Sequence, residues 1–158
     1  MLTVVTSGQD IVLAPLAHAE LVMSAPQIIS GTSKGTRVVV ELLSGRFDGR
    51  LAGTLTGGSS ADWILVGSDG AASLDVRFLL QTDDDATIYV ECRGRADLSP
   101  GAEGGPSMLA MTFEAGDPRY CWLNTCVALV RADAVGSSLR YVIYEVVAGS
   151  PGERRSVR

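Results

Sequence analysis

The residues best suited to chemistry lie in two short segments, LDVRFLLQT and TIYVECRGR, which only a DDDA turn separates. Asp75 and Arg77 alternate with apolar residues in the first segment, and Tyr89 and Glu91 do so in the second. Alternate residues of a β-strand share a face, so a hairpin would bring these polar side chains together. Two carboxylates, a guanidinium and a phenol could perform general acid–base catalysis. We predict all four as catalytic residues.

Two interpretations of this polar face are open. In the first, the face is solvated and each cross-strand ion pair contributes only about 0.2–1 kcal/mol. In the second, the face lines the interior of a β-barrel, where burial shifts the pKa of a carboxyl group and fits it for proton transfer. Our functional prediction rests on the second, inward-facing arrangement.

Candidate binding residues come from three other segments. In FEAGDPRYCWLN, a strand would place Tyr120, Trp122 and Asn124 on one face, which would supply stacking surface and hydrogen-bonding groups to a ligand. A core role for Trp122 and a backbone partner for Asn124 are the competing interpretation. In YVIYEVV, Tyr144 and Glu145 point opposite ways, so one of them is interior. The predicted substrate-binding residues are Asp62, Trp63, Met108, Tyr120, Trp122, Asn124 and Tyr144.

These side chains require β-strands to position them. Short apolar or alternating runs recur between turn sequences such as GTSKG, SDGA, TDDDA and GDPR, whereas helical periodicity is scarce. The predicted strands cover residues 18–24, 36–49, 51–57, 62–68, 71–82, 87–98, 107–116, 120–133 and 139–147. We predict an all-β fold: a single antiparallel barrel of about eight to ten strands with an internal ligand cavity. A flattened sandwich is the alternative.

The predicted domain plan has three parts. Residues 1–17 form an extension that could add one strand, residues 18–147 form the barrel, and residues 148–158 form a disordered tail. The chain has 158 residues, which is the usual size of one domain.

Composition excludes several functions. The formal charge of −5 argues against nucleic acid, which needs a basic face. Three cysteines and one histidine make a zinc site improbable, so we expect structural thiols, no metal and no cofactor. The sequence has no membrane-length apolar run and no basic signal region, so we expect a cytoplasmic protein without a membrane partner. A homo-oligomer is left open.

A series of motifs resembles a known family. In order they are GTSKGTR, GRFDGRLAGTLTGG, ADW, LDVRFLLQTDDDATIYVECRG, FEAGDPRYCWLN and YEV. Together they are similar to the domain of unknown function 3237 family over about residues 18–147. The resemblance implies an antiparallel β-barrel whose interior could hold a small molecule, and it implies no general activity. The motif positions it points to are Asp62, Trp63, Asp75, Arg77, Thr82, Asp83, Asp84, Tyr89, Arg119, Tyr120, Trp122, Asn124 and Glu145.

Two positions depart from the family pattern. Asp85 stands where relatives carry Gly, which predicts an altered hairpin turn. The stretch that begins at Met108 is apolar where relatives carry arginines, which favours a larger and more hydrophobic ligand.

Three classes of function therefore remain. The leading prediction is a cofactor-independent enzyme that performs acid–base chemistry on a hydrophobic metabolite, of cyclase, isomerase or lyase type, in secondary or aromatic metabolism. The alternatives are a non-catalytic carrier barrel and an interaction protein with a solid barrel. A cavity with converging ionisable groups would favour the enzyme, and a filled barrel would favour the interaction protein.

Overall fold

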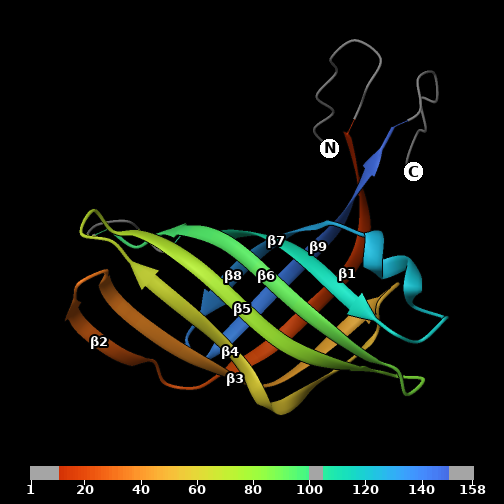
Figure 1. Cartoon of the computed structure of the whole chain (residues 1–158), viewed down its shortest axis with the longest axis horizontal. Helices are drawn as coiled ribbons and strands as arrows, with labels where there is room; N and C mark the ends of the chain where they lie inside the picture. The colour runs from red at the N-terminus through yellow and green to blue at the C-terminus, as the bar shows by residue number, and fades with distance from the viewer. Residues whose placement is uncertain (1–10, 100–104, 150–158) are drawn as a thin grey trace.

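The computed structural model describes residues 11–99 and 105–149. This part of the chain forms nine β-strands and one short 3-10 helix (Figure 1). The elements are β1 Ile11–Met23, β2 Gln27–Thr32, β3 Gly35–Gly49, β4 Gly53–Val66, β5 Ala71–Thr82, β6 Thr87–Asp97, β7 Ser107–Ala115, η1 Cys121–Thr125, β8 Ala128–Val135 and β9 Ser138–Ala148.

Antiparallel hairpins build the sheet, and β1 closes it. Strands β3 to β9 pair with their neighbours in chain order, and β1 pairs with both β9 and β3. The closed barrel therefore has eight strands, and β2 is an additional strand that pairs with the first half of β3. Closure removes the free edges that an open sheet would expose. The predicted antiparallel barrel is confirmed.

A packed apolar core fills the middle of the barrel. Phe47, Leu80, Ile88 and Met111 are each 0% exposed, and Phe78 is 1% exposed. A void large enough for water would give its lining side chains accessible surface, so none adjoins these residues. An eight-stranded barrel is just wide enough for its own side chains. Packed apolar side chains therefore occupy the middle of the barrel, where a ligand cavity was predicted.

Two hollows among the described residues lie elsewhere. One, of about 450 Å³, is lined by residues of β1, β3 and β9, including Glu20, Arg46 and Arg140. The other, of about 460 Å³, lies over β5, β6 and β7 and includes Arg95 and Met108.

Four strand predictions need correction. β1 begins at Ile11 and not at residue 18, so residues 11–17 of the predicted extension form the first part of this barrel strand. β2 was not predicted at all. The segments 51–57 and 62–68 form a single strand, β4, whose pairing with β5 shifts between Thr56 and Ala61. The predicted strand 120–133 begins as the 3-10 helix η1, and only β8 is extended. Residues 1–10 and 150–158 of the predicted extension and tail lie outside the described residues.

Candidate functional site

The four predicted catalytic residues lie on the outer face of the barrel, so the expectation that they face inward is wrong. In β5, Asp75 and Arg77 alternate with the buried Leu74, Val76 and Phe78. In β6, the same alternation places Ile88, Val90 and Cys92 inside and Tyr89 and Glu91 outside. On both strands, burial of the apolar side chains stabilises the fold more than burial of the polar ones would. The apolar face therefore enters the core.

Ion pairs organise this outer face. The Arg77 guanidinium donates to both oxygens of Asp75 at 3.1 and 3.0 Å. Glu91 accepts hydrogen bonds from Arg93 at 2.6 Å and from the Tyr89 hydroxyl at 3.1 Å. These donors lower the pKa of Glu91 below its usual value, Arg93 most of all. A carboxylate held ionised in this way is a weak base. The catalytic role of the four residues remains a prediction.

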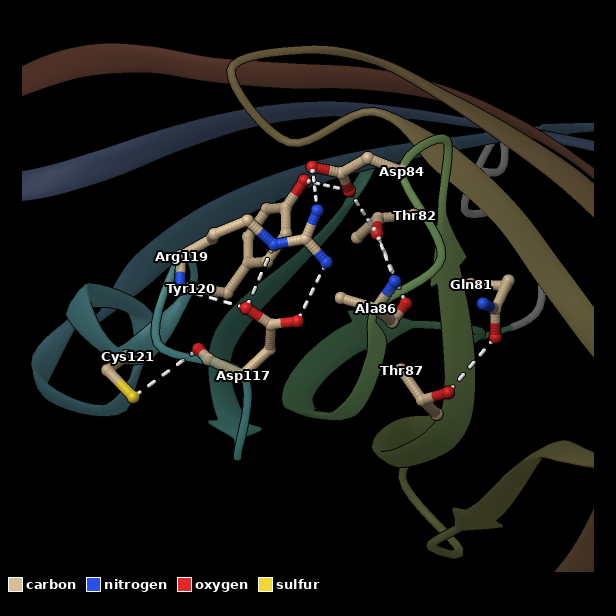
Figure 2. Close-up of polar contacts among 9 residues, drawn as sticks. All are labelled: Gln81, Thr82, Asp84, Ala86, Thr87, Asp117, Arg119, Tyr120 and Cys121. Carbon is tan, nitrogen blue, oxygen red and sulfur yellow. Dashed lines mark hydrogen bonds and ion pairs between the residues drawn. The ribbon is translucent and has the colours of Figure 1, made fainter.

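A hydrogen-bond network ties the β5–β6 turn to the loop before η1 (Figure 2). The Tyr120 hydroxyl donates to Asp84 Oδ1 at 2.7 Å, and Arg119 donates to Asp84 Oδ2 at 3.0 Å. The buried Thr82 hydroxyl lies 2.7 Å from Asp84 Oδ1 and accepts the backbone N–H of Ala86 at 2.8 Å. Tyr120, which was predicted to bind substrate, thus helps to hold the loop before η1 against the β5–β6 turn.

The other predicted binding residues of the FEAGDPRYCWLN segment also have structural contacts at the end of the barrel that holds η1. Asn124 accepts the N–H of Ala115 at 2.7 Å and donates to the carbonyl of the same residue at 2.9 Å. Trp122 lies under the Arg50 guanidinium, 5.0 Å from its ring centroid. Leu123 between them is 0% exposed and belongs to the core. The prediction that Tyr120, Trp122 and Asn124 share one strand face is therefore wrong. Residues 121–125 form a 3-10 turn, so these side chains point in different directions around the buried Leu123. We call this end of the barrel, where Leu123 is part of the core, the closed end.

Asp62 is the predicted site residue that lies at an interior-facing position. It is opposite Val40 of β3 and Val76 of β5, and both of those valines are buried. Its carboxylate accepts the backbone N–H of Asp75 at 3.2 Å, and the carbonyl of Trp63 accepts instead from Arg37 at 3.0 Å. Asp62 is only partly buried, so solvent still reaches it.

The surroundings of Asp62 are apolar, and this changes its proton affinity. Burial raises the pKa of Asp62 from 3.8 to about 6, against the lowering effect of the Asp75 N–H. Burial also raises the pKa values of the Cys92 thiol and the Tyr141 phenol, and the negative charge of Asp62 adds to both shifts. Cys92 is 0% and Tyr141 2% exposed. Among the described residues the Tyr141 hydroxyl makes no side-chain hydrogen bond. A carboxyl, a thiol and a phenol therefore influence one another electrostatically inside the barrel.

An apolar rim lies between Asp62 and the end of the barrel opposite η1. Ile64 follows Asp62 on the interior-facing side of β4 and is partly buried against the core. It is opposite Val38 of β3, which is opposite Ile28 of β2. Ile28 remains 61% exposed. We call this the open end, because its rim side chains keep accessible surface while Leu123 at the other end has none.

The remaining predicted binding residues do not join this site. Trp63 points outward beside Asp62 and is 49% exposed. Met108 lines the hollow over β5, β6 and β7, and Tyr144 lies on the outer face of β9. Cys92 and Tyr141, whose pKa values the charge of Asp62 affects, were not among the predicted site residues. The sequence did contain a signal for them, because each residue places a polar atom at a strand position that the alternation assigns to the apolar face.

Neither a metal-binding cluster nor a membrane-spanning helix is found in the described part of the chain. Residues 11–99 and 105–149 contain no group of three His, Cys, Asp or Glu side chains placed to hold a metal ion. In the same residues, no helix has the length and apolarity needed to cross a bilayer.

Comparison with known proteins agrees with this fold. A β-barrel-like protein from Acinetobacter baumannii AYE is 30% identical, with a TM-score of 0.77 over 87% of this chain and 96% of that one. A protein of unknown function from Clostridium acetobutylicum ATCC 824 is 21% identical, with a TM-score of 0.79 over 85% and 99%. An enzyme from Penicillium herquei is 21% identical, with a TM-score of 0.67 over 92% and 100%.

No curated protein matches this chain. The family model described as protein of unknown function (DUF3237) matches residues 11–146, almost all of the described barrel. This chain therefore belongs to the DUF3237 family.

Proposed function

We propose that this protein is a cofactor-independent enzyme that transfers protons to and from a neutral, hydrophobic small molecule bound at the open end. Asp62 is the acid–base residue. The reaction is a cyclisation, isomerisation or elimination, each of which needs a proton removed from one atom and returned to another.

The observation that carries the proposal is the partly exposed Asp62 carboxyl with a pKa of about 6. A general base works best when its pKa is close to the operating pH, because it is then both deprotonated and a good proton acceptor. Glu91 on the outer face lacks this property, since hydrogen bonds from Arg93 and Tyr89 lower its pKa. A shifted carboxyl in an apolar surrounding is typical of functional sites.

The rim indicates the kind of substrate. Ile28, Val38 and Ile64 share the face that leads to Asp62, and they offer surface to an apolar molecule. Arg77 and Arg93, which could bind an anionic group, are engaged in ion pairs on the outer face, and Arg37 beside the rim donates to the carbonyl of Trp63. A neutral substrate suits this arrangement best. The Penicillium herquei protein with the same fold is described as an enzyme, which supports a catalytic function without naming a reaction.

One observation favours a second candidate, a non-catalytic binding barrel. The core below Asp62 is packed, with Cys92 fully buried, so a ligand has space only at the rim. A shallow apolar site of this kind can hold a ligand without transforming it.

The deciding experiment uses two probes. Binding of Nile red, a neutral hydrophobic dye, is followed by fluorescence, and exchange of the α-protons of 2-tetralone in D₂O is followed by NMR. We expect the wild-type protein to bind the dye and to accelerate the exchange. Asp62→Asn should keep dye binding and lose the acceleration by ~10²-fold or more. The exchange rate should rise with pH through about 6, because the base form of Asp62 does the work.

Glu91→Gln and Asp75→Asn are the matched controls on the outer face. Full exchange activity in both variants would show that neither of the two outer carboxylates is catalytic. Loss of activity in these variants, with Asp62→Asn fully active, would overturn the assignment of Asp62. Dye binding without any exchange would support the carrier.

A further inference from the structure

The outer surface of the barrel has an apolar side. A row of outward-facing residues crosses β7, β8, β9 and β1 through the register pairs of Ala110, Leu129, Tyr144 and Pro15. Leu129 is 37% exposed and Tyr144 is 36% exposed. Leu13, two residues before Pro15, extends the row and is 48% exposed. We call Leu13, Pro15, Ala110, Leu129 and Tyr144 the apolar row.

A free strand edge adjoins this row. β1 pairs with β9 from Ile11 onward, but its pairing with β3 starts only at Ala17. Among the described residues, the β3-facing edge of residues 11–14 therefore has no strand beside it. The segment projects from the barrel together with the end of β9 (Figure 1). Its side chains are exposed as well, with Ile11 at 68% and Val12 at 42%.

We propose that the apolar row and the free edge of β1 form the interface of a homodimer, in which β1 pairs with the β1 of a second copy. An unpaired edge is a template for another strand, and contiguous exposed apolar residues mark protein–protein contacts. A second copy supplies both parts at once. Two antiparallel copies of the same edge satisfy each other around a two-fold axis, which is the commonest symmetry of soluble dimers.

The charges around the surface favour a second copy over a charged partner. The chain has a formal charge of −5, so two copies repel each other unless the contact region lacks free charge. The apolar row contains no ionisable side chain other than the Tyr144 phenol. The nearby charges are internally paired: Arg50 with Glu145 at 2.6 Å and Arg131 with Asp133 at 2.9 Å. A neutral surface of this kind allows self-association and offers nothing specific to a basic or acidic partner.

The test measures the mass of the full chain in solution. We expect sedimentation equilibrium of the wild-type protein at micromolar concentrations to give twice the 16.5 kDa chain mass. Leu129→Asp and Leu13→Asp each place a charge in the apolar row and should yield monomers. Val135→Asp is the matched control, because Val135 is 75% exposed but lies near the β8–β9 turn, and this variant should remain dimeric.

Hydrogen exchange separates dissociation from unfolding. In the wild-type protein the edge amides of residues 11–14 should be protected, and in Leu13→Asp they should exchange rapidly while core amides such as that of Val90 stay protected. A wild-type monomer at these concentrations would overturn the proposal. A species larger than a dimer would also overturn it, since that would indicate head-to-tail pairing through the other exposed edge at β2.

Discussion

The two ends of the barrel differ in how their polar groups are satisfied. At the closed end, η1 places Leu123 in the core, and Asp84 joins Thr82, Arg119 and Tyr120 through short hydrogen bonds. At the open end, the interior carries a carboxyl group whose pKa burial raises to about 6. One end therefore satisfies its polar groups, and the other keeps a charged group in an unfavourable place. Residues that cost stability without an obvious structural return are typical of functional sites.

The comparison also separates recognisable motifs from the site itself. The densest motif of the sequence, FEAGDPRYCWLN, builds the closed end, whereas the open end depends on the single Asp62. Mutations at the two ends should consequently affect different properties, and four predictions follow this division from the largest effect to the smallest.

The largest effect is expected at Leu123. Leu123→Ala removes a 0% exposed side chain that plugs the closed end, and it should destabilise the protein by ~2–5 kcal/mol because the loop cannot fill the space. Urea unfolding followed by circular dichroism measures this. Ile64→Ala at the open end is the control and should cost much less, since its side chain is only partly buried. Equal losses at both ends would remove the distinction between them.

Asp62→Asn should increase stability at neutral pH. The folded-state pKa is about 6 against 3.8 in the unfolded chain, so the folded state binds more protons between these values. The contribution of Asp62 to stability is therefore most favourable below pH 4 and becomes less favourable as the pH rises through 6. A shift of roughly 2 pKa units corresponds to ~3 kcal/mol, which solvent at the exposed edge of the side chain reduces to about 1–2 kcal/mol.

Thermal melts of the wild type and Asp62→Asn across this pH range check the sign. Asparagine keeps an oxygen for the Asp75 N–H, so the variant isolates the charge. If the variant is instead less stable than the wild type at neutral pH, and this difference shrinks in acid, Asp62 is a structural carboxylate and the open end resembles the closed one.

Asp84→Ala should lower the melting temperature, but by less than Leu123→Ala does. It removes the acceptor shared by Thr82, Arg119 and Tyr120, whose groups then have to find water. The hydrogen bonds from Tyr120 and Thr82 lower the pKa of Asp84. This stabilisation is therefore present above the usual carboxyl pKa and is lost in acid. Asp83→Ala is the control, because Asp83 bonds only to the exposed Arg46. No difference between the two variants would contradict the role of Asp84 in holding the loop.

Asp85→Gly should give the smallest change, a stabilisation of ~0.5–1 kcal/mol. Asp85 has φ of 69°, and it is the only non-glycine with a positive φ among the described residues. Glycine relieves that strain at some cost in unfolded-state entropy. Asp85→Asn keeps the strained backbone and removes the charge. Differential scanning calorimetry of both variants therefore separates strain from repulsion, and a gain only in the asparagine variant would identify repulsion as the cause.

The fold was largely predictable because local patterns agreed with it. β5 runs over 71–82 as predicted, since four alternating apolar residues and a tight turn define its limits. The turn at Asp85 stood out because a glycine is missing there, and the structure gives this residue a positive φ of 69°. β2 was missed because it is a short edge strand after Pro26 and is almost entirely exposed, so no burial pattern marks it. The 3-10 turn at 121–125 was missed because a few alternating residues fit a strand equally well.

The site was less predictable, because it depends on which face of each strand enters the core. The polar set of β5 and β6 carries the more reactive groups, but Leu74, Val76 and Phe78 gain more by burial than Asp75 or Arg77. Asp62 was predicted only as a binding residue. Its significance comes from its partners Val40 and Val76, which lie on other strands and are far from it in the sequence.

The hydrogen bond from the Asp75 amide to the Asp62 carboxylate provides a spectroscopic reporter. A backbone N–H that donates to an ionised carboxylate is strongly deshielded, and this deshielding weakens when the carboxyl takes up a proton. The amide proton of Asp75 should therefore shift with the titration of Asp62, although Asp75 itself belongs to the outer face. A two-dimensional ¹⁵N spectrum across a pH series would read the ionisation of the interior carboxyl directly, with no substrate in hand.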